Sequence, residues 1–310
     1  MSGGADAQIG FKSESTPGTL VVVDQFPPFK SEGLAQVINY LDTETISSRH
    51  TLSVTKQGTK EVGGPVSFEL ANVDLATLLT HMMGTVVTTG AGPYEHVATP
   101  GSLVGKSMSW QVGRPSSDGT VNPFDYAGCK VGSWTISADV GSIATMDLDL
   151  VGMTEATGGS LATASYDTAW EPFVFTEASL TLAGSAIGTV RSLSVTGDNA
   201  IERRVRLGSG TSKEPLQIGR RPYTGTVSMD FDGLTEYAKY VAGTQVALVA
   251  LFDNGTDTLT ITANVQYTGD TPTVGGQELL EQTLPFRALS ATSDATAITL
   301  TLSNTEVLAD

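Results

Sequence analysis

Two stretches of the chain, one in each half, share the same alternation of apolar and polar residues. Residues 64–70 (GPVSFEL) and residues 225–231 (GTVSMDF) carry an apolar side chain at every second position from the valine onward. This period of two is typical of a strand with one face in the core and one face in water. In both stretches the polar face carries a serine and an acidic residue, so the predicted strands match on both faces.

A short amphipathic helix is predicted after each of these strands. Residues 75–84 (LATLLTHMMG) and residues 234–243 (LTEYAKYVAG) repeat apolar residues at helical spacing, which gives each segment one buried stripe. Each segment stops at a glycine, the residue preferred just past a helix end. In the first segment Asp74 is positioned to cap the helix start, and His81 falls on the polar side, where we expect it to be solvated.

The two halves also end on a similar pattern. Residues 134–150 and residues 284–302 each predict a strand, a turn and a second strand. The order of elements therefore predicts an internal duplication, although few residues are identical. The stretch between the halves is rich in Gly, Ala, Ser and Thr, which is typical of a linker. The predicted organisation is an N-terminal arm (1–33), a first β domain (34–152), a linker with a second lead-in (153–186) and a second β domain (187–310).

The composition favours a mostly β protein and argues against several classes of function. Small and β-branched residues outnumber long helix formers, and 34 glycines indicate many turns. With 17 basic and 33 acidic residues the formal net charge is −16, which argues against tight binding to nucleic acid or to an anionic membrane. No apolar run approaches the ~18 residues that span a bilayer. The longest run, Val246–Phe252, suits a strand buried on both faces.

No residues are predicted to catalyse a reaction or to bind a metal or cofactor, and we expect no enzymatic activity. Cys129 is the only cysteine, which leaves no disulfide framework and is typical of a small buried side chain. The three histidines are not spaced as metal ligands. Residues 208–214 (GSGTSKE) lack the spacing of a phosphate-binding loop. Asn254-Gly255, between two apolar runs, indicates a hairpin turn.

One local concentration of charge stands out. Six of the 17 basic residues lie within a 19-residue stretch: Arg203, Arg204, Arg206, Lys213, Arg220 and Arg221. On an acidic chain, such a cluster favours docking onto an acidic face of another copy, because complementary fields guide association. A solvated loop with Glu202 and Glu214 as local partners explains the same cluster.

The order of these elements resembles the major tail tube protein of long-tailed bacteriophages, in particular the tail tube families of phages of actinobacteria. The resemblance covers nearly the whole chain. Its elements are, in order, an extended N-terminal arm with Glu14, Gly18-Thr19 and Phe26, a strand and a long polar loop, the Gly-x-Val-Ser strand that leads into a helix ended by Gly84, Tyr94-Glu95-His96, and two strands around residues 128–152.

The resemblance implies a structural virion protein, assembled in the host cytoplasm, with two tandem tail-tube-type β-sandwich domains that each carry a short flanking helix. Inner strands of neighbouring subunits would close a β-barrel around a channel, and rings would stack into a tube. The duplication favours three chains per ring with pseudo-sixfold symmetry, with six chains as the alternative. The implied partners are further copies, the tape measure protein, tail terminator and tail tip proteins, and DNA that passes without adhering; a membrane is not a partner.

The same resemblance selects candidate site residues. Acidic residues on the polar faces of the strands are the candidates for the channel wall: Glu69, Asp139, Asp147, Asp149 and Asp230. The arm would lie along the next ring or the neighbouring subunit, so the candidates for contacts between copies are Val21, Val22, Val23, Phe26 and Phe29, together with Arg203, Arg204, Arg206, Arg220 and Arg221. Another β-rich phage structural module, a capsid decoration or a tail-fibre-like host-binding protein, is the alternative function.

Overall fold

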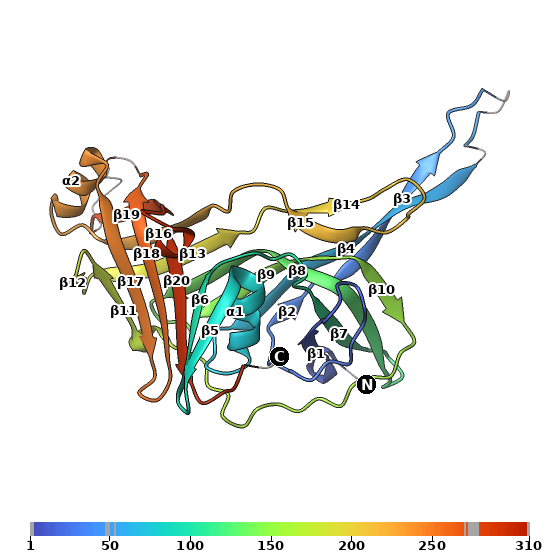
Figure 1. Cartoon of the computed structure of the whole chain (residues 1–310), viewed down its shortest axis with the longest axis horizontal. Coiled ribbons are helices and arrows are strands. Elements are labelled where there is room, and N and C mark those ends of the chain that lie inside the picture. Colours follow the sequence, from blue (N-terminus) through green and yellow to red (C-terminus); the bar gives the residue numbers. More distant parts are fainter. Residues whose placement is uncertain (1–2, 47–49, 53, 270, 272–278, 309–310) are drawn as a thin grey trace.

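The computed structural model describes residues 3–46, 50–52, 54–269, 271 and 279–308, and it confirms a mostly β protein with large antiparallel sheets (Figure 1). In the described residues the strands are β1 (Gln8–Ser13), β2 (Ser31–Glu32), β3 (Ala35–Asp42), β4 (Thr55–Glu69), β5 (Gly84–Gly90), β6 (Tyr94–Pro100), β7 (Met108–Pro115), β8 (Val121–Asp139), β9 (Thr145–Gly152), β10 (Thr154–Thr157), β11 (Ala178–Leu182), β12 (Ser185–Ala186), β13 (Val190–Asp198), β14 (Ile201–Arg204), β15 (Lys213–Gln217), β16 (Tyr223–Asp230), β17 (Gln245–Asp253), β18 (Thr258–Tyr267), β19 (Glu281–Ala288) and β20 (Ile298–Asn304). The α-helices are α1 (Leu75–Met83) and α2 (Thr235–Ala242), and short 3₁₀ turns lie at Gly4–Asp6, Phe175–Glu177 and Asp294–Thr296.

One antiparallel sheet runs without a break from the first half of the chain into the second. Its strand order is β4–β9–β8–β13–β16–β19, and we call it the inner sheet. The crossing between the halves is the β8–β13 pair, in which Ser133 to Asp139 oppose Asp198 to Ser192. The halves share other strands as well, because the β5–β6 hairpin of the first half extends the sheet of the second half through β20.

The two halves repeat the same order of strand pairs. In the first half the pairs are β1–β7, β7–β8, β8–β10, β8–β9, β9–β4 and β4–β2. In the second half the corresponding pairs are β11–β17, β17–β18, β18–β20, β18–β19, β19–β16 and β16–β13. The repeated register extends to single residues: Ser31 opposes Ser67, and Ser192 opposes Ser228, each 161 positions later in the chain.

These pairs correct one part of the sequence alignment. The sequence matched residues 134–150 with residues 284–302, but β8 and β9 pair with each other, whereas β19 pairs with β16 and β18, and β20 pairs with β18 and β6. The counterpart of the β8–β9 hairpin is therefore β18–β19, one strand earlier. The alternation of apolar and threonine residues is so common in β-strands that it does not distinguish successive strands.

β17 is not buried on both faces, as the run Val246–Phe252 predicted. Its buried residues alternate, with Val246, Leu248, Ala250 and Phe252 facing the core and the intervening side chains exposed or half-buried. Two other sequence predictions are confirmed: β17 and β18 are joined by a tight turn at Asn254-Gly255, and Cys129 is fully buried.

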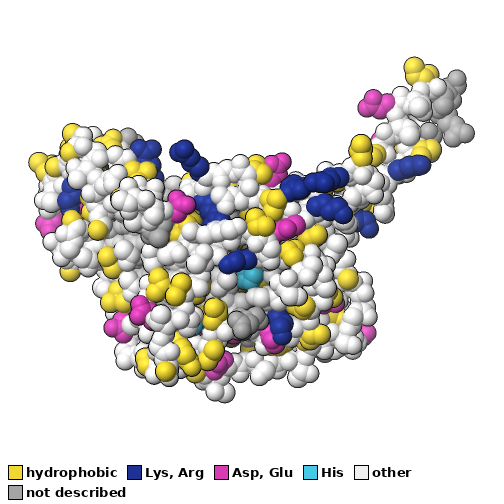
Figure 2. Space-filling model, in the orientation of Figure 1, with side chains coloured by type: hydrophobic (Ala, Val, Ile, Leu, Met, Phe, Trp, Pro, Cys, Tyr) yellow, Lys and Arg dark blue, Asp and Glu magenta, His cyan; other side chains and the backbone are white. Residues whose placement is uncertain are grey.

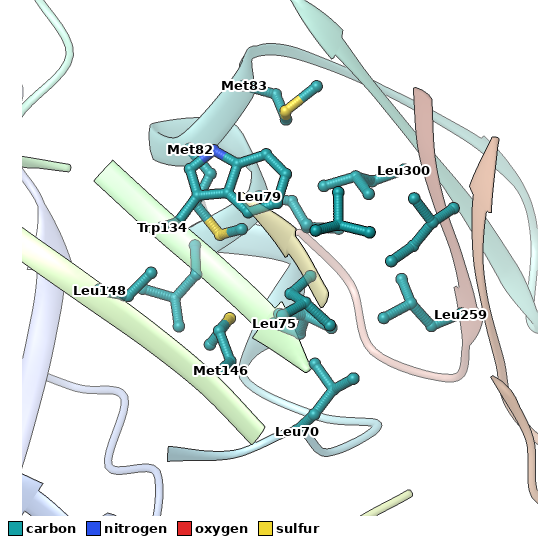
Figure 3. Close-up of a cluster of buried hydrophobic side chains, with 14 of the residues drawn as sticks. Leu70, Leu75, Leu79, Met82, Met83, Trp134, Met146, Leu148, Leu259 and Leu300 are labelled. Carbon is teal, nitrogen blue, oxygen red and sulfur yellow. The ribbon is translucent and has the colours of Figure 1, made fainter. Parts of the chain in front are cut away.

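α1 lies in the middle of the molecule, between the inner sheet and strands of the second half. Figure 3 shows Leu75, Leu79 and Met82 of the helix packed between two groups of side chains, one of them Trp134, Met146 and Leu148 of the inner sheet, the other Leu259 and Leu300 of β18 and β20. Every residue of α1 except Thr80 is buried. The helix ends as predicted at Gly84, whose φ of 100° is open to glycine and strained for other residues.

Full enclosure of α1 makes two sequence predictions wrong. His81 is buried rather than solvated, its Nε2 lies 2.9 Å from the Ser13 hydroxyl, and burial lowers its pKa to about 3, with Lys106 and Lys130 acting in the same direction. Asp74 does not cap the helix with its side chain. Instead its backbone N–H donates to the Glu306 carboxylate at 2.9 Å, so the helix start is fixed by the C-terminal segment.

Candidate self-assembly surfaces

The inner sheet has one apolar face and one polar face. On the apolar side Trp134 crosses over Gly197, where a Cβ atom would come within 2.4 Å of the indole ring, and packs against Tyr223 at 6.2 Å between ring centroids. On the other side, one row across the sheet consists of Ser67, Asp147, Thr135, Thr196, Thr224 and Arg287. This polar face spans both halves of the chain and carries mostly short hydroxyl and acidic side chains, with Arg287 on the border strand β19.

Hydroxyl groups on this face hydrogen-bond to one another across strands. Thr135 and Thr196 link the two halves at 3.0 Å, Ser137 and Thr145 lie 2.8 Å apart, and Ser228 and Thr283 lie 3.2 Å apart. Such short, mutually bonded side chains leave a smooth, wet surface, because they project little and offer water the remaining donors and acceptors.

All five acids that the sequence selected lie on this polar face. Asp147 and Asp149 of β9 and Asp139 at the end of β8 are exposed, and Glu69 of β4 is half-buried. Asp230 of β16 is partly neutralised, because Arg191 donates to it at 2.6 Å and also contacts Glu281 at 2.6 Å. The structure therefore brings these carboxylates onto one surface, with Arg191 as a counter-charge near one border.

The N-terminal segment is built into the chain's own fold. β1 pairs along its whole length with β7, and Ile9 and Phe11 are fully buried. Of the contact candidates, Val23 and Phe26 are also buried within the chain, where Phe26 lies against Gly10. Val21 and Phe29 are half-buried, and Val22 is 79% exposed. Val22 is thus the candidate in this segment with most apolar surface free for another copy.

A buried carboxylate fixes the turn that follows β1. Glu14 is 6% exposed and accepts hydrogen bonds from the hydroxyls of Ser107 and Ser109 and from the backbone N–H groups of Gly18 and Gly128. Four donors compensate the lost hydration of the charge. The Glu14 and Gly18 motif in the sequence is therefore a structural anchor of the segment.

The basic cluster divides into anchoring and exposed residues. Arg203 donates to the carbonyl of Val62 at 2.9 Å, and Arg221 donates to the carbonyls of Met83, at 2.9 Å, and Gly101. Both hold the β14–β15 ribbon of the second half (residues 201–217) against the first half. Arg206 and Arg220 are exposed and Arg204 is half-buried. Figure 2 shows dark-blue Lys and Arg side chains gathered along this ribbon and the neighbouring base of the β3–β4 hairpin.

Sequence reasoning missed the ion pair that fastens the same ribbon. Lys130 is 1% exposed, and its Nζ contacts the Glu214 carboxylate at 2.6 Å and the Leu103 carbonyl at 2.7 Å. Burial lowers the pKa of Lys130, which Glu214 counteracts. Burial also acts to raise the pKa of Glu214, but hydrogen bonds from Lys130 and Gly105 outweigh it and the pKa is lowered. Residues 84 positions apart give no local signal of such a pair.

The projecting β3–β4 hairpin is a second feature that the sequence pattern did not reveal. Its strands pair from Ala35 with Gly63 to Asp42 with Thr55, and it projects from the body along the long axis of the molecule (Figure 1). It carries apolar side chains that its own chain leaves more than half exposed: Val37, Tyr40, Leu41, Ile46 and Leu52. Apolar surface on a projecting hairpin is typical of a contact with another molecule.

The described residues contain neither a candidate metal-ion cluster nor a helix that could span a membrane. Among them, no group of three or more His, Cys, Asp or Glu side chains is arranged to hold a metal ion. Of the two described α-helices, neither has the length and apolarity that a membrane span requires.

Comparison with known proteins adds one finding. The model of a family described as phage tail tube protein matches residues 4–288. A search of curated proteins finds no match.

Proposed function

Since the chain belongs to the phage tail tube protein family, we propose that it polymerises with copies of itself into closed rings, which stack into the tube of the virion tail. Family membership makes it a structural component of the tail and points to a non-enzymatic role. The observation that carries the ring is the inner sheet. β8 of one half pairs directly with β13 of the other, which provides a template for joining successive units edge to edge.

Within this proposal the chain contains two related units. The repeated strand pairs support a first unit that includes β1 as well as β2 to β10, and a second unit from β11 to β20. Three chains would then supply six units to a ring with pseudo-sixfold symmetry. Head-to-tail contacts of this kind close when the rotation between units divides a full turn. Rings would assemble in the host cytoplasm, and tail terminator and tail tip proteins would bind the two ends of the tube.

The polar face of the inner sheet would line the channel. The tape measure protein would occupy this channel during assembly, and DNA would pass through it during ejection. Asp147, Asp149 and their neighbours support this role, because an acidic wall repels phosphate groups and avoids the affinity that a basic wall gains by releasing counterions. Ser and Thr hydroxyls between the acids keep the wall hydrated without adding positive charge.

Electron microscopy of the purified full-length protein tests the proposal directly. We expect rings or tubes with a central channel, and an average along the tube axis with three strong and three weaker densities. An average with six equal densities would indicate six chains per ring instead of three, and the proposed tube would still stand. A protein that stays a compact monomer at high concentration, without a channel, would refute the proposal.

The channel wall can be tested separately from assembly. The double variant Asp147→Lys, Asp149→Lys should still form tubes, because both side chains are exposed, but phage that carry it should eject DNA poorly. A matched control is Glu95→Lys with Asp253→Lys, which makes the same charge change at exposed positions outside the inner sheet. Equal infectivity of the two variants would show that β9 does not line the channel.

A further inference from the structure

The two helices have corresponding positions in the repeat but very different surroundings. α1 has eight buried residues, whereas α2 has none. On α2 and just before it, Val241 and Leu234 are 65% and 67% exposed. A helix with an apolar face left in water lacks a partner that the same helix in the first half possesses.

The partner of α1 comes from the second half of the same chain. Arg221, at the base of the β14–β15 ribbon, donates to the carbonyl of Met83, the last residue of α1. Asn199, just before the ribbon, donates to the carbonyl of Met82 at 3.0 Å. A positively charged side chain at a helix C-terminus satisfies free carbonyl groups and complements the helix dipole.

The repeat identifies the counterparts of these residues. An offset of 161 residues relates the β2–β4 pair to the β13–β16 pair. The same offset aligns Arg221 with Lys60, which lies at the base of the β3–β4 hairpin. The helix ends correspond as well: Met83 precedes Gly84 as Ala242 precedes Gly243, and both glycines have positive φ. In the described part of the chain, no side chain donates a hydrogen bond to the carbonyl of Val241 or Ala242. Nor does any described residue form an ion pair with Lys60 or accept a hydrogen bond from its side chain.

The hairpin cannot reach α2 of its own chain. Figure 1 shows α2 and the β3–β4 hairpin at opposite ends of the long axis of the molecule. The β14–β15 ribbon extends from the second half over the first half, and the hairpin extends further in the same direction, beyond the body. Repeating the contact between the halves therefore brings the hairpin of one copy onto the second half of another.

We infer that the C-terminal end of α2 is the docking site for the base of the β3–β4 hairpin of a second copy, with Lys60 in the position that Arg221 takes on α1. This contact rests on the proposed function and specifies how successive chains of a ring join. Lys60 donates to the carbonyls at the end of α2, and apolar side chains of the hairpin cover Val241. The contact is head-to-tail, so each copy offers one hairpin and one α2.

Cross-linking between single-cysteine variants of the full-length chain tests the contact. Glu61→Cys protein, which keeps Lys60 and places the thiol at an exposed position beside it, is mixed with Ala242→Cys protein and treated with a short bifunctional maleimide, so every product with both sites joins two chains. Cys129 does not interfere, because it is fully buried and burial raises the pKa of its thiol. The control partner is Thr256→Cys, exposed at the far end of β17 from α2, about 30 Å away along the strand.

We expect the Glu61→Cys and Ala242→Cys pair to cross-link roughly tenfold more than the Glu61→Cys and Thr256→Cys pair, because docking would bring only the first pair of thiols together. Equal yields, or none, overturn the docking site. Rings seen by electron microscopy without this cross-link would refute the contact and leave the proposed function standing. If the cross-link instead forms between copies that assemble only into open chains, the contact would stand and the proposed closed rings would be refuted.

Charge and shape variants give a second readout. Val241→Glu and Lys60→Glu should each abolish rings with little change in the melting temperature of the isolated subunit, because Val241 is exposed and the half-buried Lys60 forms no ion pair with a described residue. Lys60→Arg, which places in the hairpin the residue found at position 221, should assemble normally. Normal assembly of Lys60→Glu would show that this lysine has no part in the contact.

Discussion

α1 and α2 occupy matching places in two repeats of one strand order, yet only α1 is covered. The second half of the chain supplies the cover, through β18 and β20 on one side and Arg221 and Asn199 at the helix end. Among the described residues, no strands or capping side chains enclose α2 in the same way, and none of its residues is buried. The difference indicates that a helix in this fold is buried by contacts from another repeat rather than by its own.

Replacing an apolar side chain by alanine in each of the two matched helices should give the largest difference in the free energy of unfolding. Leu79→Ala in α1 removes a fully buried side chain and should lower the free energy of unfolding by about 2–5 kcal/mol. Val241→Ala in α2 should change it by no more than about 0.5 kcal/mol, because that side chain is already in water. Denaturant unfolding of isolated subunits measures both. Equal losses would mean that α2 is packed as tightly as α1.

Breaking the buried ion pair under the ribbon should have the next largest effect on the free energy of unfolding. Glu214→Gln leaves the Lys130 ammonium buried without its carboxylate, which costs about 3 kcal/mol. The double variant Lys130→Met, Glu214→Gln removes both charges and should recover most of that loss. If the single variant proves as stable as wild type, the ion pair does not fasten the ribbon. Chemical denaturation at neutral pH gives the comparison.

Arg221 and Lys60, which correspond in the two repeats, should contribute differently to the stability of the isolated subunit. Arg221→Gln weakens charged hydrogen bonds to Met83 and Gly101 and should cost about 2 kcal/mol. Lys60→Gln should cost less than about 0.5 kcal/mol, since Lys60 makes no ion pair with a described residue of its own chain. Thermal unfolding at concentrations below ring formation separates the two. A large loss for Lys60→Gln would indicate an intramolecular role for this lysine.

A last expected effect on stability depends on pH. Burial, followed by the charge of Asp167, raises the pKa of Asp74 to about 6, and burial with the charge of Asp74 raises that of Glu306 to about 7. The folded state therefore binds more protons than the unfolded state between about pH 4 and 7, so stability falls as pH rises through this window. At ~1.4 kcal/mol per pKa unit, the two raised pKa values together set an upper limit of about 6 kcal/mol on this loss. Glu306→Gln should flatten this part of the stability profile, and an unchanged slope would contradict the assignment.

Much of the local structure was determined by the sequence. The period of two in residues 64–70 and 225–231 predicted strands and their faces. The same alternation in β9 places Asp147 and Asp149 together on the polar face of the inner sheet. Gly84 and Gly243 ended both helices because glycine adopts positive φ at low cost. The repeat was visible as an order of elements, and Asn254-Gly255 as a turn.

Only the tertiary structure decided which faces found partners. His81 looked solvated on a helical wheel, but a helix enclosed by sheets of both halves has no solvent side. Residues 1–33 looked like an arm for another copy, but β7 offered β1 a free edge in the same chain. Lys130 meets Glu214, and the two halves share one sheet, through contacts between residues dozens of positions apart. Local patterns encode what a segment needs to bury, and the assembled chain determines what is there to bury it against.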